Sequence, residues 1–337
     1  MTAILIIKLG ALGDVLRTTC ILPGLHQKYP DAHISWLTAA NATCLLDTNP
    51  LIETVLVIND QSHKLLRQQT YDLVINLEDD FPVCQIASSL HATDFFGAYL
   101  KKDRPQYTSD SAPWFDMSLI SRFGKTKADR LKQINQNSYP DLLFKGLGLT
   151  PGLPCLKVPQ HDQLFATRFA ENYLANDKLV VGLNTGAGGR WQHKQLSVIQ
   201  TASLANHLTR DAGKQVLLYG GAGEKERNEQ ILSLSNGSIV DTKTDNSLLR
   251  FAALVNLADV LITSDSLAFH IASALHIKCV VFFGPTSATE IKLFGPGIKI
   301  IADIPCICCY RKRCTLTPHC MDTILSHDLI NAVNKLL

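Results

Sequence analysis

The feature that most constrains the fold of this chain is a repeated alternation of short apolar runs with helix-type patterns. Residues 3–9 (AILIIKL) and 72–77 (DLVINL) are apolar runs of the kind that form strands buried within a sheet. Two more runs, 33–38 and 55–59, lie between them, and helical stretches connect the series. Because alternating strands and helices form βαβ units, we predict an α/β fold with a doubly wound parallel sheet.

The same alternation resumes after a break that is rich in proline. Residues 150–162 (TPGLPCLKVPQHD) hold three prolines and predict a linker. Strand-type runs follow at 179–184, 215–221, 260–265 and 278–284. We predict two Rossmann-like doubly wound domains, residues 1–155 and 165–322, that face a cleft. Residues 323–337 predict a C-terminal helix that packs back toward the N-terminal domain.

The balance of charge and hydropathy excludes several classes of protein. The 337 residues carry a formal net charge of +2, whereas a nucleic-acid partner favours a concentrated basic surface. No apolar run reaches the ~18 residues that a membrane span needs, and the N-terminus lacks the cleavage site of a signal peptide. We therefore predict a cytoplasmic protein with no nucleic-acid partner.

The first strand run ends in a glycine turn, KLGALGDVL. Gly10 and Gly13 are too few for the dinucleotide fingerprint, and the lysine of a Walker phosphate loop is missing from this turn. The glycines still permit a tight turn or close approach of a ligand. Asp14 then falls near a helix start, where an acid is commonly an N-cap or a first-turn partner of the helix dipole. The alternative is a general base that points into the cleft.

The second domain opens with GLNTGAGGRWQHKQLS, residues 182–197. Here a strand runs into Thr185, Gly186 and further glycines, and the cations Arg190 and Lys194 precede a helix. Exposed backbone amides, a hydroxyl and two cations beyond a strand suit a phosphate or diphosphate. A plain glycine-rich turn with solvated charges is the alternative.

A second glycine turn, LLYGGAGEKERNEQ, places Glu224 near the start of the next helix. One interpretation is a partner of the helix dipole. The other is an acceptor of hydrogen bonds from ribose hydroxyls, which is the role of the acid in a Rossmann site. The sequence alone leaves both open.

The segment ITSDSLAFHIASALH carries a third set of candidates after a strand. Asp265 and Ser266 lie at the strand end, and His270 follows one turn into the helix. The backbone N–H groups of residues 266–268 would point at an anion. We interpret Asp265 as a ligand of sugar hydroxyls, while a core or surface histidine is the alternative for His270.

Half of the ten cysteines crowd into residues 306–320. They are Cys306, Cys308, Cys309, Cys314 and Cys320. With Cys308 as an alternate, the other four have the spacing C-x2-C-x4-C-x5-C, which predicts a structural site for zinc or iron. The basic residues 311–313 would lower the thiol pKa values and favour metal binding. Reduced, packed thiols without metal are the alternative.

Together these segments resemble glycosyltransferase family 9, the ADP-heptose:lipopolysaccharide heptosyltransferase family. LGALGDVLRTTCILPGLHQKYPDAHISWLT is similar to the family's N-terminal pattern, and GLNTGAGGRW followed by lysine resembles its phosphate segment. DSLAFHIASALHIKCVVFFGPT resembles its D-[ST]-G-x-x-H-x-A-x-A signature, with Leu267 in place of the glycine. A cysteine string ending in Cys320-Met321 also recurs in many members. The resemblance covers nearly the whole chain.

The resemblance implies a B-type glycosyltransferase fold, with the acceptor bound mainly by the first domain and the nucleotide sugar by the second. It implies an inverting transfer of heptose from ADP-heptose to a lipopolysaccharide inner-core acceptor, with no cofactor required for catalysis. The enzyme would work in the cytoplasm at the inner face of the inner membrane. Its near-zero charge permits at most peripheral membrane contact. The alternatives are a bacterial surface protein as acceptor and an inactive nucleotide-sugar-binding module.

The resemblance also implies a role for each matching position. Asp14 would be the general base, beside the acceptor-side turn of Gly10 and Gly13, and Lys194 would stabilise the leaving diphosphate. The donor would contact Thr185, Gly186, Arg190, Glu224, Asp265, Ser266, Leu267 and His270. Because Leu267 adds a bulky side chain where the sugar or diphosphate approaches, the identity of the donor stays open.

Overall fold

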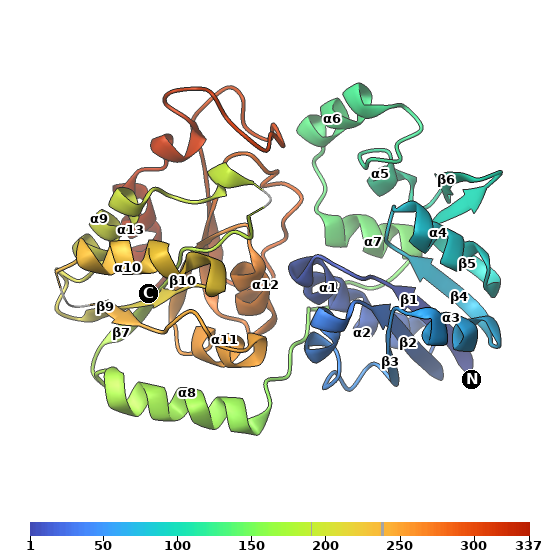
Figure 1. Ribbon diagram of the computed structural model, residues 1–337, viewed down its shortest axis with the longest axis horizontal. Helices are drawn as coiled ribbons and strands as arrows, with labels where there is room; N and C mark the ends of the chain where they lie inside the picture. Colours follow the sequence, from blue (N-terminus) through green and yellow to red (C-terminus); the bar gives the residue numbers. More distant parts are fainter. Residues whose placement is uncertain (190, 237–238) are drawn as a thin grey trace. The chain divides into compact units, whose positions relative to one another are not determined.

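A computed structural model describes residues 1–189, 191–236 and 239–337, apart from the side chain of Gln192. The chain divides into two compact units, Met1–Lys157 and Val158–Leu337, each of which has a sheet flanked by helices (Figure 1). The predicted α/β class is therefore confirmed. The division falls within residues 150–162, the segment that the prolines marked as a linker.

The sheet of the first unit has the strand order β3-β2-β1-β4-β5-β6. Its strands are β1 (Thr2–Ile7), β2 (Ala32–Thr38), β3 (Thr54–Val57), β4 (Thr70–Asn76), β5 (His91–Lys101) and β6 (Arg104–Tyr107). Its helices are α1 (Leu12–Thr18), η1 (Thr19–Ile21), α2 (Leu22–Lys28), η2 (Ala40–Leu45), α3 (Asp60–Arg67), α4 (Phe81–Ser88), α5 (Ala112–Phe115), α6 (Lys125–Ile134) and α7 (Tyr139–Leu147). β5 and β6 pair antiparallel, and the other neighbours pair parallel.

β1 lies between β2 and β4, at the point where the order of the parallel strands reverses. Residues 4–7 of β1 are fully buried, which explains their continuous apolar sequence. Ile7 is in register with Asn76 of β4, so the residues that follow β1 and β4 emerge side by side. In doubly wound sheets such a switch point is where ligands bind.

The second unit has the strand order β12-β11-β10-β7-β8-β9, with parallel neighbours. Its strands are β7 (Leu179–Asn184), β8 (Lys214–Tyr219), β9 (Ile239–Asp241), β10 (Val260–Ser264), β11 (Lys278–Phe283) and β12 (Gly297–Ile301). Its helices are α8 (Gln160–Tyr173), η3 (Gln192–Lys194), α9 (Val198–Leu208), η4 (Ala222–Glu224), α10 (Lys225–Ser233), α11 (Leu248–Val255), α12 (Leu267–Ala274), η5 (Cys320–Thr323) and α13 (Ser326–Leu336). The switch point lies between β7 and β10, whose ends carry the predicted donor residues.

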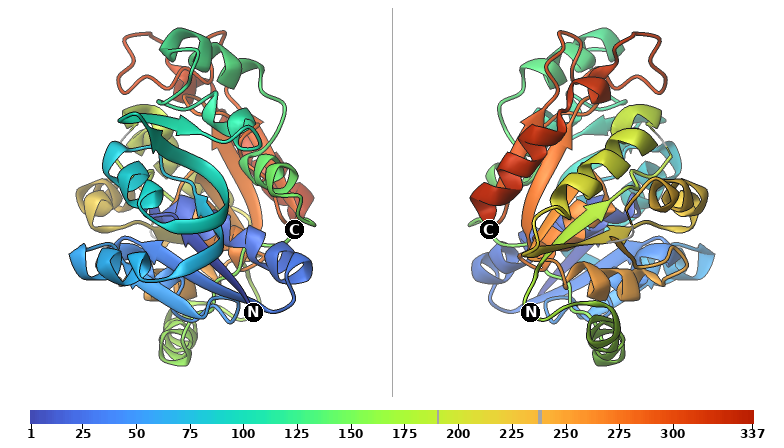
Figure 2. Two further views of the ribbon diagram at one scale, coloured as in Figure 1. Left: turned by 90° about the vertical axis from the view of Figure 1, so that its right-hand side faces the viewer. Right: turned by 90° about the vertical axis from the view of Figure 1, so that its left-hand side faces the viewer.

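The C-terminal helix α13 corrects one expectation. We predicted that residues 323–337 pack back toward the N-terminal domain, but α13 packs on α9, β10, β11 and β12 of the second unit. Figure 2 shows it alongside those strands. Leu329, Ala332 and Val333 belong to the core of the second unit, because the apolar face of the helix covers the sheet there.

Helix α9 begins at a cap that fixes the loop before it. The Ser197 hydroxyl accepts from the Gln200 N–H at 3.1 Å, and the Gln200 side chain accepts from the Ser197 N–H at 2.9 Å. This reciprocal capping box satisfies two free N–H groups of the first turn. It fixes the start of α9 at Val198 and thereby anchors the segment that carries Lys194.

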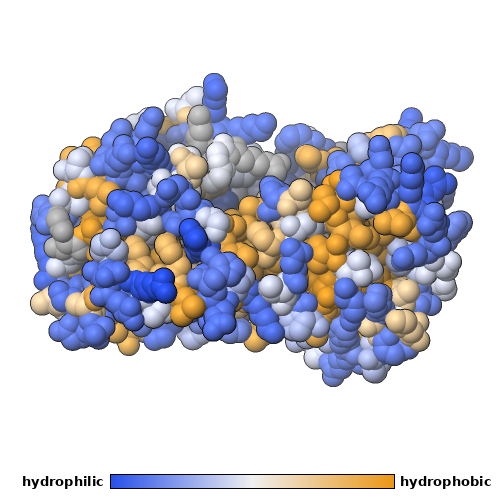
Figure 3. Space-filling view, turned by 60° about the horizontal axis from the view of Figure 1, so that its bottom comes forward, coloured by the Kyte–Doolittle hydropathy of each residue, from blue (hydrophilic) through white to orange (hydrophobic). Residues whose placement is uncertain are grey.

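The surface of the protein mixes polar and apolar residues. On the face drawn in Figure 3, hydrophobic residues form groups that are separated by hydrophilic ones. Within the described residues, no helix combines the length and the hydropathy that crossing a bilayer requires.

Candidate functional site

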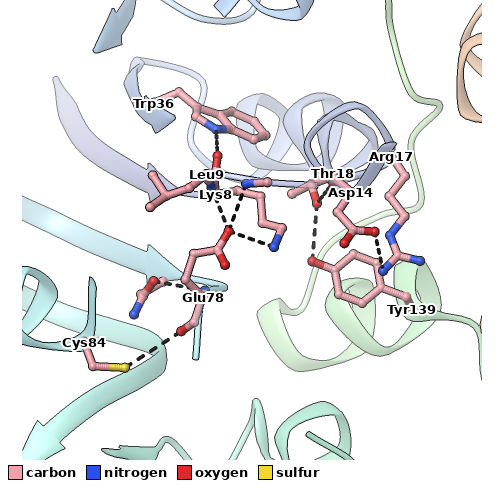
Figure 4. Close-up of polar contacts among 11 residues, drawn as sticks. Lys8, Leu9, Asp14, Arg17, Thr18, Trp36, Glu78, Cys84 and Tyr139 are labelled. Atoms are coloured by element: carbon pink, nitrogen blue, oxygen red, sulfur yellow. Dashed lines mark hydrogen bonds and ion pairs between the residues drawn. The ribbon is translucent and has the colours of Figure 1, made fainter. Parts of the chain in front are cut away.

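At the switch point of the first unit, a buried ion pair anchors the turn that follows β1. The Lys8 ammonium donates to Glu78 Oε1 at 2.8 Å, and the same oxygen accepts from the N–H groups of Leu9 at 2.7 Å and Gly10 at 3.3 Å (Figure 4). Burial by itself lowers the pKa of Lys8, but the carboxylates of Glu78 and Asp14 outweigh it, and the pKa is raised. Lys8 is therefore a fixed positive charge beside Asp14.

Asp14 lies in the first turn of α1, which confirms its interpretation as a first-turn acid, whereas Ala11 occupies the N-cap position, so the N-cap interpretation is wrong. The Asp14 carboxylate is instead ion-paired with Arg17 on the next turn, with 3.0 Å between Oδ1 and Nη2. The Asp14 side chain is 36% exposed and that of Arg17 is 11% exposed. A carboxylate open to solvent thus has its cationic partner fixed behind it.

Aromatic side chains hold Arg17 in place. The centre of its guanidinium lies 4.1 Å from the centroid of the Tyr139 ring and 5.9 Å from that of Trp114. The two rings pack edge to face, with their centroids 4.5 Å apart. The Tyr139 hydroxyl lies 3.3 Å from Thr18 Oγ1, which ties α7 to α1. Stacking on an aromatic face is a favourable position for a guanidinium.

The acceptor-side turn predicted at Gly10 and Gly13 forms the entry to α1. A Cβ added to Gly10 would meet no heavy atom of the described chain within 4 Å, so the turn is open on that side. Gly13 is buried inside α1. Contact of this turn with an acceptor stays a prediction.

At the switch point of the second unit, Asn184 joins the ends of β7 and β10. Its Nδ2 lies 2.8 Å from the carbonyl oxygen of Gly186, 3.0 Å from Thr263 Oγ1 and 3.3 Å from Ser266 Oγ. Ser266 is the N-cap residue of α12, but in the described chain its side chain makes no capping hydrogen bond. The N–H groups at the start of α12 are therefore not satisfied by that side chain, which favours an anion there.

Lys194 and Asp265 form the charged centre of this site. Lys194 Nζ donates to Asp265 Oδ2 at 2.9 Å, and both side chains are mostly buried. Thr286 Oγ1 donates to the same oxygen at 3.1 Å, and His270 Nε2 lies 3.9 Å from Oδ1. The sequence placed Lys194, Asp265 and His270 in one site, and the structure brings them together.

Thr185 and Glu224 lie on the other side of the β7 end. The Thr185 hydroxyl is buried and donates to Asn228 Oδ1 at 2.6 Å, so its polar group is used within the protein. Glu224 Oε2 accepts from the Gly221 N–H at 3.0 Å. A Cβ on Gly186 would come within 3.0 Å of the Glu224 carboxyl group, so the two predicted donor residues are in contact range. Because glycine has no Cβ, the backbone at Gly186 can approach the Glu224 carboxyl group this closely.

Leu267 and Arg190 are the two remaining residues of the predicted donor site. Leu267 is the first residue of α12 and is half-buried beside the N-cap. Arg190 lies outside the described residues. The structure therefore gathers the predicted donor positions at one switch point in the second unit, with Arg190 not placed.

Comparison with known proteins identifies the family. The family model described as glycosyltransferase family 9 (heptosyltransferase) matches residues 61–319. The chain belongs to this family. A lipooligosaccharide heptosyltransferase 2 of Campylobacter jejuni is 29% identical over 174 residues, which cover 48% of this chain and 53% of that protein. The chain thus spans about half the length of that curated relative.

Solved structures of family 9 members share the fold. A family 9 glycosyltransferase from Veillonella parvula aligns with a TM-score of 0.78 at 18% identity, covering 99% of this chain and 97% of its own. The E. coli ADP-heptose lps heptosyltransferase II aligns with a TM-score of 0.69 at 20% identity, covering 100% of this chain and 98% of its own. The predicted B-type glycosyltransferase fold is thereby confirmed.

The cysteine cluster of this family 9 member was predicted to hold a structural metal ion. In the part of the chain that the structure describes, no three His, Cys, Asp or Glu side chains are grouped as metal ligands, so the expected set at Cys306, Cys309, Cys314 and Cys320, with Cys308 as alternate, is not assembled. None of these five cysteines forms a disulfide. A zinc or iron ion at this cluster stays a prediction.

We predicted that the basic residues 311–313 lower the pKa values of the nearby thiols, and this prediction is wrong for Cys320. Burial, followed by the thiols of Cys309, Cys314 and Cys306, raises the pKa of Cys320 to about 11. Its Sγ lies 3.9 Å from the carbonyl oxygen of His193, next to Lys194. Cys320 therefore packs behind the donor-site loop as a neutral thiol.

Several residues of these sites escaped sequence reasoning. In the second unit they are Asn184, Asn228 and Thr286. In the first unit they are Lys8, Arg17, Glu78 and Tyr139. Lys8, Glu78 and Asn184 lie at or directly after the ends of strands next to a switch point, and that position was a signal available from the strand pattern. Arg17 and Tyr139 had no comparable signal, because their contact joins α1 to α7, two helices far apart in the sequence.

Proposed function

We propose that this protein is an inverting glycosyltransferase that moves a heptose from ADP-heptose to a lipopolysaccharide inner-core acceptor. The observation that carries the proposal is the Lys194–Asp265 pair at the N-terminus of α12, in a member of glycosyltransferase family 9. A cation beside free helix N–H groups suits a diphosphate, and an adjacent carboxylate suits sugar hydroxyls.

On the donor side, Lys194 would stabilise the negative charge that develops on the leaving diphosphate. One of its N–H groups is used by Asp265 in the structure, and an ammonium has two more to offer. With the N–H groups at the start of α12, it would supply the electrostatic stabilisation that the reaction needs. We therefore propose catalysis without a metal or organic cofactor. Glu224, against Gly186, would accept from the ribose hydroxyls.

On the acceptor side, Asp14 would remove the proton of the attacking hydroxyl. Inversion by a single displacement needs one base on the face opposite the leaving group. The Asp14 carboxylate is partly exposed and is held at the open turn of the first unit. The range matched by the family model begins at residue 61, so the support for Asp14 comes from this geometry.

The proposal is tested by incubating the protein with ADP-heptose and a lipopolysaccharide that lacks heptose, and measuring release of ADP. Asp14→Asn should abolish turnover while ADP-heptose binding, measured by calorimetry, survives. Asp129→Asn is the matched control, because Asp129 is also paired in a helix of the same unit but lies in α6. Retained turnover in the Asp14 variant would refute its role as base.

Absence of ADP release with every nucleotide sugar, together with tight binding of one of them, would instead identify an inactive binding module. Leu267 is the residue to test for donor choice. If it narrows the space for the sugar, Leu267→Gly should broaden the range of donors that release ADP. A surface protein as acceptor, peripheral contact with a membrane and a cytoplasmic location at its inner face stay predictions from the sequence.

A further inference from the structure

We propose that Arg17, clamped on the ring of Tyr139, is a positioning residue that fixes the direction of the Asp14 carboxylate and keeps it ionised. The inference rests on the proposed role of Asp14 as general base. It adds a second component to the acceptor site: a cation on α1 that acts through Asp14.

The burial of the two partners separates this pair from an ordinary surface ion pair. In α6, Lys125 and Asp129 are paired as well, and their side chains are 81% and 43% exposed. Such pairs contribute little, because both partners are solvated and mobile. In the Asp14 pair only the carboxylate is open to solvent, and Arg17 is 11% exposed. Its positive charge is therefore less screened and acts from a fixed place.

The clamp restricts Arg17 to one geometry. Its guanidinium lies over the Tyr139 ring at 4.1 Å while Nη2 reaches Asp14 at 3.0 Å. Tyr139 is itself fully buried and is held near Thr18 by its hydroxyl. Because a planar guanidinium on a ring can present its N–H groups in few directions, the carboxylate that it binds is held in one orientation.

Charged and titratable groups surround Asp14 from four elements of the first unit. Arg17 comes from α1, Lys8 and its partner Glu78 follow the ends of β1 and β4, and Tyr139 comes from α7. Figure 4 draws the Asp14 carboxylate between the Lys8 ammonium and the Arg17 guanidinium. Glu78 offsets part of the charge of Lys8, since the two are paired at 2.8 Å. Arg17 is thus ion-paired directly with the proposed base.

Two consequences follow for the reaction. Removing the charge of Arg17 makes the ionised form of its partner less favourable, so the pH at which activity is lost on the acid side rises. Removing the clamp also lets the carboxylate rotate away from the acceptor hydroxyl, and turnover falls. If Arg17 had only a structural role, replacing it would lower stability or acceptor binding and would leave the pH profile of activity unchanged.

The test compares kcat/KM for the acceptor, from pH 4.5 to 9, in the wild type, Arg17→Gln, Arg17→Lys and Lys125→Gln. We expect Arg17→Gln to lower kcat about tenfold or more and to move the acid limb upward by about one pH unit. Arg17→Lys keeps the charge without the planar stack, so it should restore the acid limb and only part of kcat. Lys125→Gln removes the exposed pair and should match the wild type in both.

A measurement that does not depend on turnover keeps the two proposals apart. In protein with 13C-labelled aspartate carboxyl groups, the resonance missing from Asp14→Asn belongs to Asp14, and its titration midpoint should rise in Arg17→Gln. If Asp14→Asn abolishes turnover but neither the acid limb nor this midpoint moves in Arg17→Gln, the role of Arg17 is wrong and that of Asp14 stands. If Asp14→Asn retains turnover, the proposed function of Asp14 fails whatever the resonance does.

Discussion

Lys194 Nζ and Asp265 Oδ2 lie 2.9 Å apart in the second unit, and Thr286 shares the carboxylate. Both side chains are mostly buried. Removing either partner would therefore leave the charge of the other one buried without its ion-pair partner. Lys194 belongs to the segment before α9, whereas Asp265 directly follows β10. The ion pair therefore joins two separate segments of the chain into one donor site.

We expect Lys194→Met to reduce kcat by about 100-fold or more, since it removes a preorganised donor from the leaving diphosphate. Calorimetry with ADP should show weaker binding at the same time. Asp265→Asn keeps the size of the side chain and serves as the comparison. It should weaken binding of the nucleotide sugar more than binding of ADP, because Asp265 is proposed to contact the sugar. Equal loss for both ligands would contradict that assignment.

The buried pair of Lys8 and Glu78 should contribute strongly to the stability of the first unit. We expect Glu78→Gln to lower its free energy of unfolding by about 3–5 kcal/mol, because a buried charge is left without its partner. Fluorescence in a Trp191→Phe background reports on the first unit alone, through Trp36 and Trp114. The Lys8→Met, Glu78→Leu double variant should be less destabilised than Glu78→Gln, and a double variant that is worse would contradict this account.

The same pair predicts how stability depends on pH. The pKa of Lys8 is raised in the folded protein, so its contribution is fully present below the unfolded value of about 10.4 and is lost as the pH rises through the folded value. The wild type should therefore lose stability above about pH 10.4 more steeply than the double variant at Lys8 and Glu78. Chemical denaturation at pH 8 and pH 11 measures the difference, and identical slopes would exclude a raised pKa. Both proteins keep the tyrosines, which cancel in the comparison.

Gly186 gives a steric test of the donor site. A methyl group at this position would lie 3.0 Å from the Glu224 carboxyl group, so Gly186→Ala should displace Glu224. We expect the Kd for ADP to rise by about tenfold, the equivalent of about 1.4 kcal/mol of strain. Gly189→Ala is the matched control, because a Cβ there meets no heavy atom of the described chain within 4 Å. An unchanged Kd in the Gly186 variant would argue that Glu224 does not contact the nucleotide.

Cys320 should react slowly with a thiol reagent at pH 8, since its pKa of about 11 leaves little thiolate. Mass spectrometry of partly labelled protein measures its rate against Cys306, Cys309 and Cys314, and Cys320→Ser identifies the labelled peptide. Elemental analysis of protein purified without an affinity tag checks the arrangement of the cluster. A full equivalent of zinc or iron, bound with loss of reactive thiols, would show that the cluster holds a metal ion, whereas less than about a tenth of an equivalent would reject the metal site.

The strands that could be predicted are those with the strongest apolar runs. β1, β4, β7 and β10 lie at the centres of their sheets, and burial on both faces leaves a continuous apolar sequence. β9 and β12 lie at edges and are partly exposed, so their sequences carry a weaker pattern and were missed. β5 was missed for the same reason, because its first residues, 91–94, are exposed. The error over α13 arose because an amphipathic pattern shows that a helix covers something apolar but not which sheet it covers.

The sequence by itself determined the α/β class, the two domains and the ends of the central strands, because these depend on local hydrophobic pattern and on prolines and glycines. It also singled out Lys194, Asp265, His270, Glu224 and Asp14 as side chains near those ends. Only the tertiary structure decided their partners. Thr286 is hydrogen-bonded to Asp265, and Thr185 is hydrogen-bonded to Asn228. Arg17, the ion-pair partner of Asp14, lies on the ring of Tyr139. It also decided that Cys320 is buried, with the thiols of Cys309, Cys314 and Cys306 near enough to raise its pKa. The physical reason is that hydrogen bonds and ion pairs require groups within a few ångströms, and only the folded chain brings distant segments that close.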